Sequence, residues 1–164
     1  MDTALENVVL VVAGVLTGLH AGLLYDFSVD IVPALRSIKG TAHISMIQAI
    51  NVKIQNPVFF LSFFGPIVLL PLAAVLHWGQ PQFAWLVAAS IIQIVGCEGV
   101  TIAGNIPLNN ELARVDPDRL SEVEADRIRT EFQGPGAPWI RFHALRTLAG
   151  IAATTILFVV CLSK

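Results

Sequence analysis

Charged side chains are scarce in this chain of 164 residues. Asp, Glu, Lys and Arg make up 13% of it, whereas soluble domains carry about 25%. Hydrophobic residues account for 55%, and the mean hydropathy is +0.72. The formal net charge is only −2, so no basic field favours a nucleic acid. The composition predicts an integral membrane protein whose partner is membrane lipid, with no nucleic acid bound.

Cysteine is also rare, and basic residues are missing from the start of the chain. Cys97 and Cys161 both lie within apolar runs, which indicates buried thiols rather than a disulfide. No Lys or Arg precedes the first apolar run, whereas a cleaved signal peptide has a positively charged start. We therefore expect this run to be a retained membrane span.

Four apolar runs are long enough to cross a membrane as helices, at about 5–27, 57–76, 83–103 and 139–162. We predict an all-α fold, an up-down four-helix transmembrane bundle in a single domain over residues 1–164. The connection between the first two runs is expected to be helical from Thr41 onward. A charged amphipathic helix beginning at Asp116-Pro117 should lie on the bundle end, between the third and fourth spans.

The basic residues are distributed unequally between the two ends of this bundle. Only Lys164 falls on the side of the termini; the other nine fall on the opposite side: Arg36, Lys39, Lys53, Arg114, Arg119, Arg127, Arg129, Arg141 and Arg146. By the positive-inside rule that side is cytoplasmic. We predict a bacterial-type inner-membrane protein with both termini on the non-cytoplasmic side.

Glycine recurs at every fourth position of the first span, at Gly14, Gly18 and Gly22. Small residues at this spacing let a second helix backbone approach closely. The pattern therefore indicates either a packing face, within the bundle or in a homo-oligomer, or the ordinary tolerance of membrane helices for glycine.

The third apolar run ends in a polar stretch, Gly104 to Leu112, that contains three asparagines and Pro107. Asparagine favours caps and turns over helix interiors, and proline lacks the N–H that a helix needs. We expect the helix to end here in a shaped loop. Asn105, Asn109 and Asn110 either cap that end or bind a ligand at the mouth of a pocket.

Ionisable residues within the spans are costly, so His20, Glu98, His143 and Arg146 are the candidates for catalysis. Counted from the span ends at 1.5 Å per residue, the three spans place them within about 5 Å of a common level. Arg146 is the expected partner of Glu98, with His143 or His20 next. The alternatives are a structural ion pair and a metal site of His20, Glu98 and His143. Because nothing like HExxH is present, we predict no metal ligands, and the sequence specifies no cofactor.

Three stretches together carry a resemblance to a known family: Met46 to Asn51, Thr101 to Asn110, and Trp139 to Thr147. In this order and spacing, the chain resembles the anthrone oxygenase-like family of small four-span membrane proteins. Some members resemble catalysts that insert oxygen into anthrones to give anthraquinones. The positions that the resemblance carries over are Gln48, Asn51, Asn105, Pro107, Asn109, Asn110, Trp139 and Arg146.

The leading hypothesis is a membrane-embedded oxygenase or oxidoreductase that acts on a small lipophilic substrate near the cytoplasmic face, with an aromatic, anthrone-like molecule as the candidate. His143 or His20 would remove a proton from an activated C–H bond, and the carbanion would react with O2. Arg146, Asn105 and Asn109 would stabilise the enolate oxygen. Asn110, Trp139, Gln48 and Asn51 complete the expected substrate-binding set. The alternative is a non-catalytic binding or assembly module whose buried polar residues fix helix packing; a solute carrier is less well supported.

Overall fold

The computed structural model describes residues 3–163, and these residues are helical with no strand among them. Four candidate membrane spans fall within Ala4–Arg36, Pro57–Leu76, Phe83–Leu112 and Glu122–Leu162. The predicted all-α, four-span architecture is therefore confirmed. In chain order the elements are α1 (Thr3–Asp26), η1 (Phe27–Ile31), α2 (Val32–Arg36), α3 (Gly40–Lys53), α4 (Pro57–Leu76), α5 (Phe83–Ile91), η2 (Ile92–Gly99), η3 (Thr101–Asn105), α6 (Ile106–Leu112), η4 (Pro117–Arg119), α7 (Glu122–Gln133) and α8 (Pro138–Leu162).

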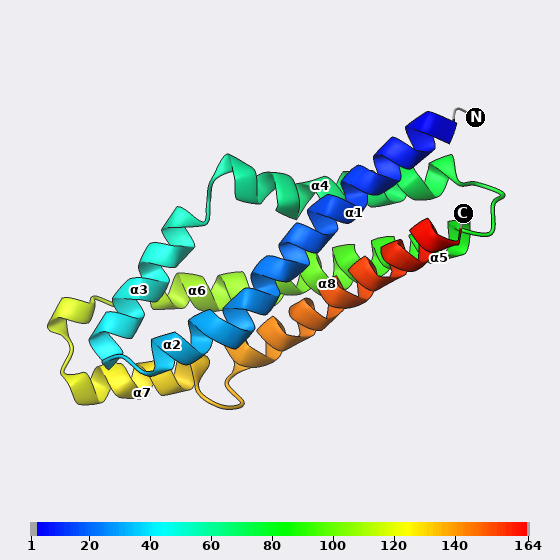
Figure 1. Ribbon diagram of the computed structural model, residues 1–164. Helices are drawn as coiled ribbons and strands as arrows, with labels where there is room; N and C mark the ends of the chain where they lie inside the picture. The colour runs from blue at the N-terminus through cyan, green and yellow to red at the C-terminus, as the bar shows by residue number, and fades with distance from the viewer. Residues whose placement is uncertain (1–2, 164) are drawn as a thin grey trace.

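The bundle has two different ends (Figure 1). The N-terminal end of α1, the C-terminal end of α8 and the α4–α5 connection lie at one end, while α3 and α7 lie at the other. The start of α1 and the end of α8 are thus on the same side of the bundle, as an up-down order of four spans requires. The side of the membrane that each end faces stays a prediction, and Lys164, on which the charge asymmetry partly rests, lies outside the described residues.

Local sequence explains where the second and fourth spans begin. The Asn56 side chain accepts a hydrogen bond from the Phe59 backbone N–H at 3.0 Å, and Pro57 occupies the first turn of α4. Pro138 has the same place in α8. Proline is tolerated at a helix start because its missing N–H would have no intrahelical partner there. The bounds of α4 agree with the predicted 57–76, and α8 begins one residue before the predicted 139.

The first and third spans are longer than the sequence suggested. The helix predicted to end near Phe27 continues through η1 and α2 to Arg36, and the one predicted to end at Ala103 continues to Leu112. The predicted loop over Gly104–Leu112 is therefore wrong. In both cases a π-helical segment ends two residues before a proline, at Ile31 before Pro33 and at Asn105 before Pro107. The wider π turn relieves the clash that a proline ring would otherwise cause with the preceding turn, so the helix axis continues.

The second difference concerns the amphipathic helix at the bundle end. Asp116 caps only the short η4, where its side chain accepts from the Asp118 N–H. The longer α7 begins after Ser121, which forms a reciprocal capping box with Glu124. A capping box satisfies two N–H groups that would otherwise be unpaired, and this fixes the helix start downstream of the predicted one.

Helices α2, α3, α6 and α7 form a cap on this end of the bundle. They share a hydrophobic cluster whose buried members are Leu35, Ile44, Ile47, Leu112 and Ala125. His43 of α3 lies fully buried beside it, with Nδ1 3.0 Å from the Leu35 carbonyl oxygen. Burial lowers the pKa of His43, and the charges of Arg129 and Arg36 add to that effect, while the bond to Leu35 opposes it. The neutral ring thus serves packing at this point.

A substitution at Gly40 should detach this cap. A Cβ at Gly40 would lie 2.6 Å from both the Ala125 carbonyl carbon and the Asp126 nitrogen, which are backbone atoms of α7. Because backbone cannot rotate aside, we expect Gly40→Ala to destabilise the protein by about 2–3 kcal/mol. The measurement is thermal unfolding in detergent, with limited proteolysis of the 113–116 connection. Gly14→Ala is the control, since no atom lies within 4 Å of its added Cβ; equal melting temperatures for the two variants would contradict the expectation.

Candidate functional site

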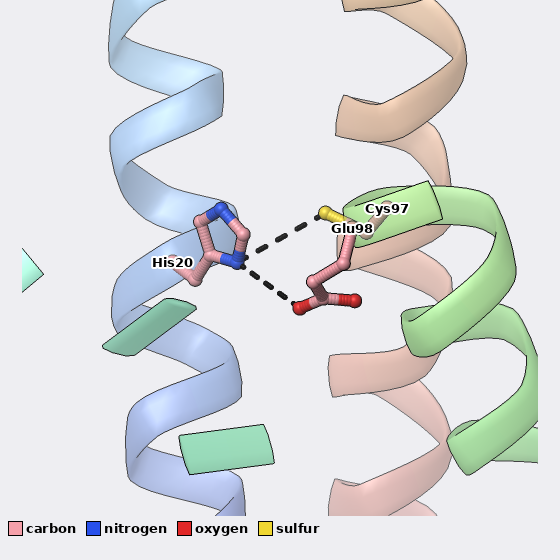
Figure 2. Close-up of side chains that lie close together, drawn as sticks. All are labelled: His20, Cys97 and Glu98. Carbon is pink, nitrogen blue, oxygen red and sulfur yellow. Dashed lines mark hydrogen bonds and ion pairs between the residues drawn. The ribbon is translucent and has the colours of Figure 1, made fainter. Parts of the chain in front are cut away.

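A fully buried group of polar side chains joins α1 to η2 (Figure 2). His20 projects from α1 toward Cys97 and Glu98 of η2, and all three are at most 1% exposed. His20 Nδ1 lies 3.6 Å from Glu98 Oε1 and 4.0 Å from Cys97 Sγ. Gln93, also of η2, is fully buried and donates from Nε2 to Glu98 Oε1 at 2.9 Å. We call His20, Gln93, Cys97 and Glu98 the His20 cluster.

Local backbone geometry brings two consecutive residues into the same cluster. In an α-helix the side chains of neighbouring residues diverge by about 100°, whereas the wider π turn of η2 separates them less. Glycines then let the helices approach: a Cβ at Gly96 would lie 2.8 Å from the Ala149 Cβ, and one at Gly150 would lie 3.2 Å from the Ala21 Cβ. The glycines thus pack η2 on α8 and α8 on α1, and the π segment lets both Cys97 and Glu98 reach His20 of α1.

Two polar atoms of the His20 cluster are left without a partner. Glu98 Oε2 and Gln93 Oε1 are buried, and neither has a hydrogen-bond partner within residues 3–163. A buried carboxylate oxygen without a partner is costly, because it has lost its water and gained nothing in exchange. The cluster therefore has spare capacity to accept a proton or to bind a cation.

A second polar group, the Arg146 network, lies toward the capped end and consists of Ser28, Thr101, His143 and Arg146. Arg146 donates from Nε and Nη2 to His143 Nδ1 at 3.2 and 3.0 Å, and from Nη1 to Thr101 Oγ1 at 3.2 Å. His143 Nε2 lies 2.9 Å from Ser28 Oγ, whose own hydrogen is donated to the Leu24 carbonyl. His143 therefore carries its proton on Nε2, and both of its ring nitrogens are occupied.

The expected pairing of Glu98 with Arg146 is wrong, since Glu98 contacts His20 and Gln93 while Arg146 contacts His143 and Thr101. The candidate catalytic residues thus form two separate groups, His20 with Glu98 and His143 with Arg146. His143 is therefore not part of a metal site with His20 and Glu98, which was the alternative suggested by the sequence. The described residues that could share an ion are instead His20, Cys97 and Glu98, whose ligand atoms lie within 4.8 Å of one another.

The asparagine stretch is bound to the start of α8. Asn105 donates from Nδ2 to the Trp139 carbonyl at 3.0 Å, and the Trp139 indole N–H donates to Asn109 Oδ1 at 2.7 Å. Trp139 also stacks on the His143 ring, with centroids 4.8 Å apart, and lies 5.6 Å from the Arg146 guanidinium carbon. These contacts of Trp139 fix the position of the Arg146 network relative to the asparagine stretch.

The remaining residues that the resemblance carried over lie in the cap, outside both polar groups. Gln48 of α3 donates from Nε2 to the carbonyls of Leu112 and Val115, at 2.9 and 2.8 Å, and so completes the end of α6. Asn51 is half-buried on α3, and Asn110 is exposed on α6. The structure therefore does not bring these three together with the four candidate catalytic residues.

Sequence reasoning missed an aromatic row on α4. The rings of Phe59 and Phe63 lie 6.2 and 5.2 Å from the His20 ring. Phe60 and Phe64 follow outward, at 5.8 Å from Phe59 and 5.0 Å from Phe63, and these two are 38% and 51% exposed. We call these four residues the phenylalanine row. Its signal in the sequence is two Phe-Phe pairs four residues apart, which a helix places on neighbouring faces. Cys97 and Gln93 were likewise overlooked as members of the site.

The glycine stripe of α1 faces away from the His20 cluster. Gly14, Gly18 and Gly22 line an apolar groove of about 770 Å³ between α1 and α8, together with Thr154 and Phe158 among others. No atom comes within 4 Å of a Cβ built at Gly14 or Gly22, and at Gly18 only Thr154 Cγ2 does, at 3.7 Å. Within residues 3–163 the stripe therefore makes no close helix contact, and its use between subunits stays a prediction.

Comparison with known proteins identifies the family. A family model described as anthrone oxygenase matches residues 59–156, a segment that includes the phenylalanine row, Gln93, Cys97, Glu98 and the asparagine stretch but not His20. No curated protein and no solved structure matches the chain. The matched segment covers more than half of this four-span helical chain, and it contains two of the three stretches that carried the resemblance, Thr101 to Asn110 and Trp139 to Thr147. The chain belongs to the anthrone oxygenase family.

Proposed function

We propose that this chain is a membrane-embedded oxygenase that oxidises a lipophilic, aromatic, anthrone-like substrate at the His20 cluster. The single observation that carries the proposal is the position of the phenylalanine row. It runs from the exposed rings of Phe60 and Phe64 to the buried ring of Phe63 beside His20. A flat apolar molecule dissolved in the bilayer would meet aromatic contacts along this whole route.

Glu98 is the base that best suits the chemistry. Oxidation of an anthrone methylene begins with loss of a proton, and the carbanion then reacts with O2; a C–O bond forms, the O–O bond breaks, and a carbonyl and one water result. The acceptor must have a free lone pair, and Glu98 Oε2 has no partner among the described residues. His143, the base expected from the sequence, has its lone pair occupied by Arg146. Nδ1 of His20 lies near the other Glu98 oxygen and can support the charge that develops there.

The phenylalanine row gives the proposal a direct test. We expect Phe63→Ala to raise the KM for an anthrone about tenfold, the equivalent of one lost aromatic contact, while kcat changes less. Oxygen uptake and product formation by purified protein in lipid nanodiscs are the measurements. Phe158→Ala is the matched control, because that ring is 66% exposed and lines the groove on the other side of α1.

Two results would count against the proposal. One is wild-type protein that consumes no oxygen with a panel of anthrones and hydroquinones, which would favour the alternative of a non-catalytic assembly module. The other is a KM that rises equally in the Phe63 and Phe158 variants, which would remove the phenylalanine row from the substrate route.

A further inference from the structure

We propose that His20 Nδ1, Cys97 Sγ and the Glu98 carboxylate bind a single divalent transition-metal ion of the Zn²⁺ or Fe²⁺ class inside the bundle. The inference goes beyond the proposed function, because it concerns binding and requires no turnover. It replaces the expectation, drawn from the sequence, that the chain has no metal ligands.

The spacing of the three ligand atoms suits one ion. Metal bonds of about 2.0–2.3 Å to nitrogen, oxygen and sulfur place tetrahedral ligands roughly 3.3–3.6 Å apart. His20 Nδ1 lies 3.6 Å from Glu98 Oε1 and 4.0 Å from Cys97 Sγ, and all three ligand atoms lie within 4.8 Å of one another. Figure 2 shows both other side chains directed at the same ring nitrogen of His20. Shifts of up to about 1 Å in the flexible Glu98 and Cys97 side chains would complete the coordination.

Charge balance favours a divalent ion at this depth. Cys97 would release its proton on binding, so that a thiolate, a carboxylate and a neutral imidazole surround a charge of +2. The complex is then neutral, which is the state that a buried site between apolar helices permits at least cost. Without an ion, the Glu98 carboxylate has only the Gln93 amide and the His20 ring as polar contacts within the described chain.

The surroundings resemble those of a metal site with one open position. Gln93 Nε2 donates to Glu98 Oε1 at 2.9 Å and approaches His20 Nδ1 at 3.4 Å, so it orients the carboxylate from outside the three ligands. Three protein ligands leave a fourth position for water or substrate, the arrangement of catalytic rather than structural sites. The mixture of nitrogen, sulfur and oxygen donors suits Zn²⁺ or Fe²⁺ and disfavours Mg²⁺ and Ca²⁺.

The test uses purified full-length protein with Cys161 replaced, so that Cys97 is its single thiol. Cys161, which the sequence suggested to be buried, is exposed on α8, so the Cys161→Ser protein serves as the matched background. After chelation and reloading with Zn²⁺ or with Fe²⁺ under anaerobic conditions, elemental analysis should give one metal ion per chain. We expect Cys97→Ser and His20→Gln, each made in that background, to weaken the affinity at least tenfold, while His143→Gln leaves it unchanged. The better-retained ion of the two identifies the metal.

A second measurement needs no substitution at the site. Co²⁺ loaded into the Cys161→Ser protein should produce a thiolate-to-cobalt charge-transfer band in the near ultraviolet. Its absence, or a metal content below about a tenth of an ion per chain in both loading arms, would overturn the proposal even if the Cys97 variant failed to fold. Metal binding by a protein that oxidises no anthrone would sustain this inference while refuting the proposed function.

Discussion

Replacing Glu98 with Gln should lower kcat for anthrone oxidation by about 10²–10⁴, the usual contribution of a positioned general base. The amide is nearly the same size as the carboxylate and can keep the contact with Gln93, so the bundle should still fold. It cannot accept the substrate proton, however, and the acceptor that Glu98 Oε2 provides is lost. The measurement is the initial rate of oxygen uptake at saturating substrate.

Glu6→Gln is the matched control for this substitution. Glu6 is also a buried carboxylate, 6% exposed, but it lies near the start of α1, where Gln80 Nε2 donates to it at 3.3 Å. Its replacement should leave kcat within about twofold of the wild type. The metal content of every preparation is measured alongside, so that loss of a base is distinguished from loss of a bound ion. A well-folded Glu98→Gln protein that retains a tenth or more of wild-type kcat would show that this carboxylate is not the base.

Replacing Arg146 with Met should reduce stability more than catalysis. Arg146 is the donor that satisfies His143 Nδ1 and one of the groups that holds Thr101, and it lies over the Trp139 ring. Methionine fills similar volume but leaves the buried His143 nitrogen without a donor, which costs about 1–3 kcal/mol, and the lost cation–π contact adds about 1. We expect a total loss of roughly 2–4 kcal/mol in the free energy of unfolding. The measurement is denaturant titration in detergent.

Arg141→Met controls for the loss of a positive charge on the same helix, since Arg141 is exposed on α8. It should change stability by less than about 0.5 kcal/mol. The kcat of the folded Arg146 variant should remain within about threefold of the wild type. A drop of 10² or more at unchanged stability would instead return Arg146 to the catalytic role that the sequence suggested, as a stabiliser of the enolate.

Much of the fold could be predicted from the sequence because the membrane imposes it. Apolar runs of about 20 residues must form helices, since the bilayer core offers no partner for backbone N–H and C=O groups. The bounds of α4 and α8 agree with the prediction to within one residue. The prediction failed at the ends of the first and third spans, whose helices continue past Pro33 and Pro107. A π turn before each proline relieves the clash of its ring with the preceding turn. Whether a π turn forms depends on the packing around the helix rather than on the proline itself.

The candidate site, like the fold, could be predicted from the sequence only in part. The sequence indicated that His20, Glu98, His143 and Arg146 are unusual, because each is costly within a span, and counting the rise per residue correctly placed His20 near Glu98. It did not predict that Arg146 would bind His143 instead of Glu98, or that Cys97 would join the cluster. Those pairings depend on the rotation of each helix about its axis, and the π segments change that rotation in ways that residue spacing does not reveal.

By itself, then, the sequence determined that the chain is an all-α membrane protein with four spans, and it identified the residues too polar to face lipid. Only the tertiary structure decided which of those residues meet. The physical reason is that a span requires only hydrophobicity and length, whereas a site requires the angular position of side chains to within a fraction of a turn. In this protein that position is set by π turns in η2 and η3 and by the close approach of Gly96 and Gly150 to their neighbours.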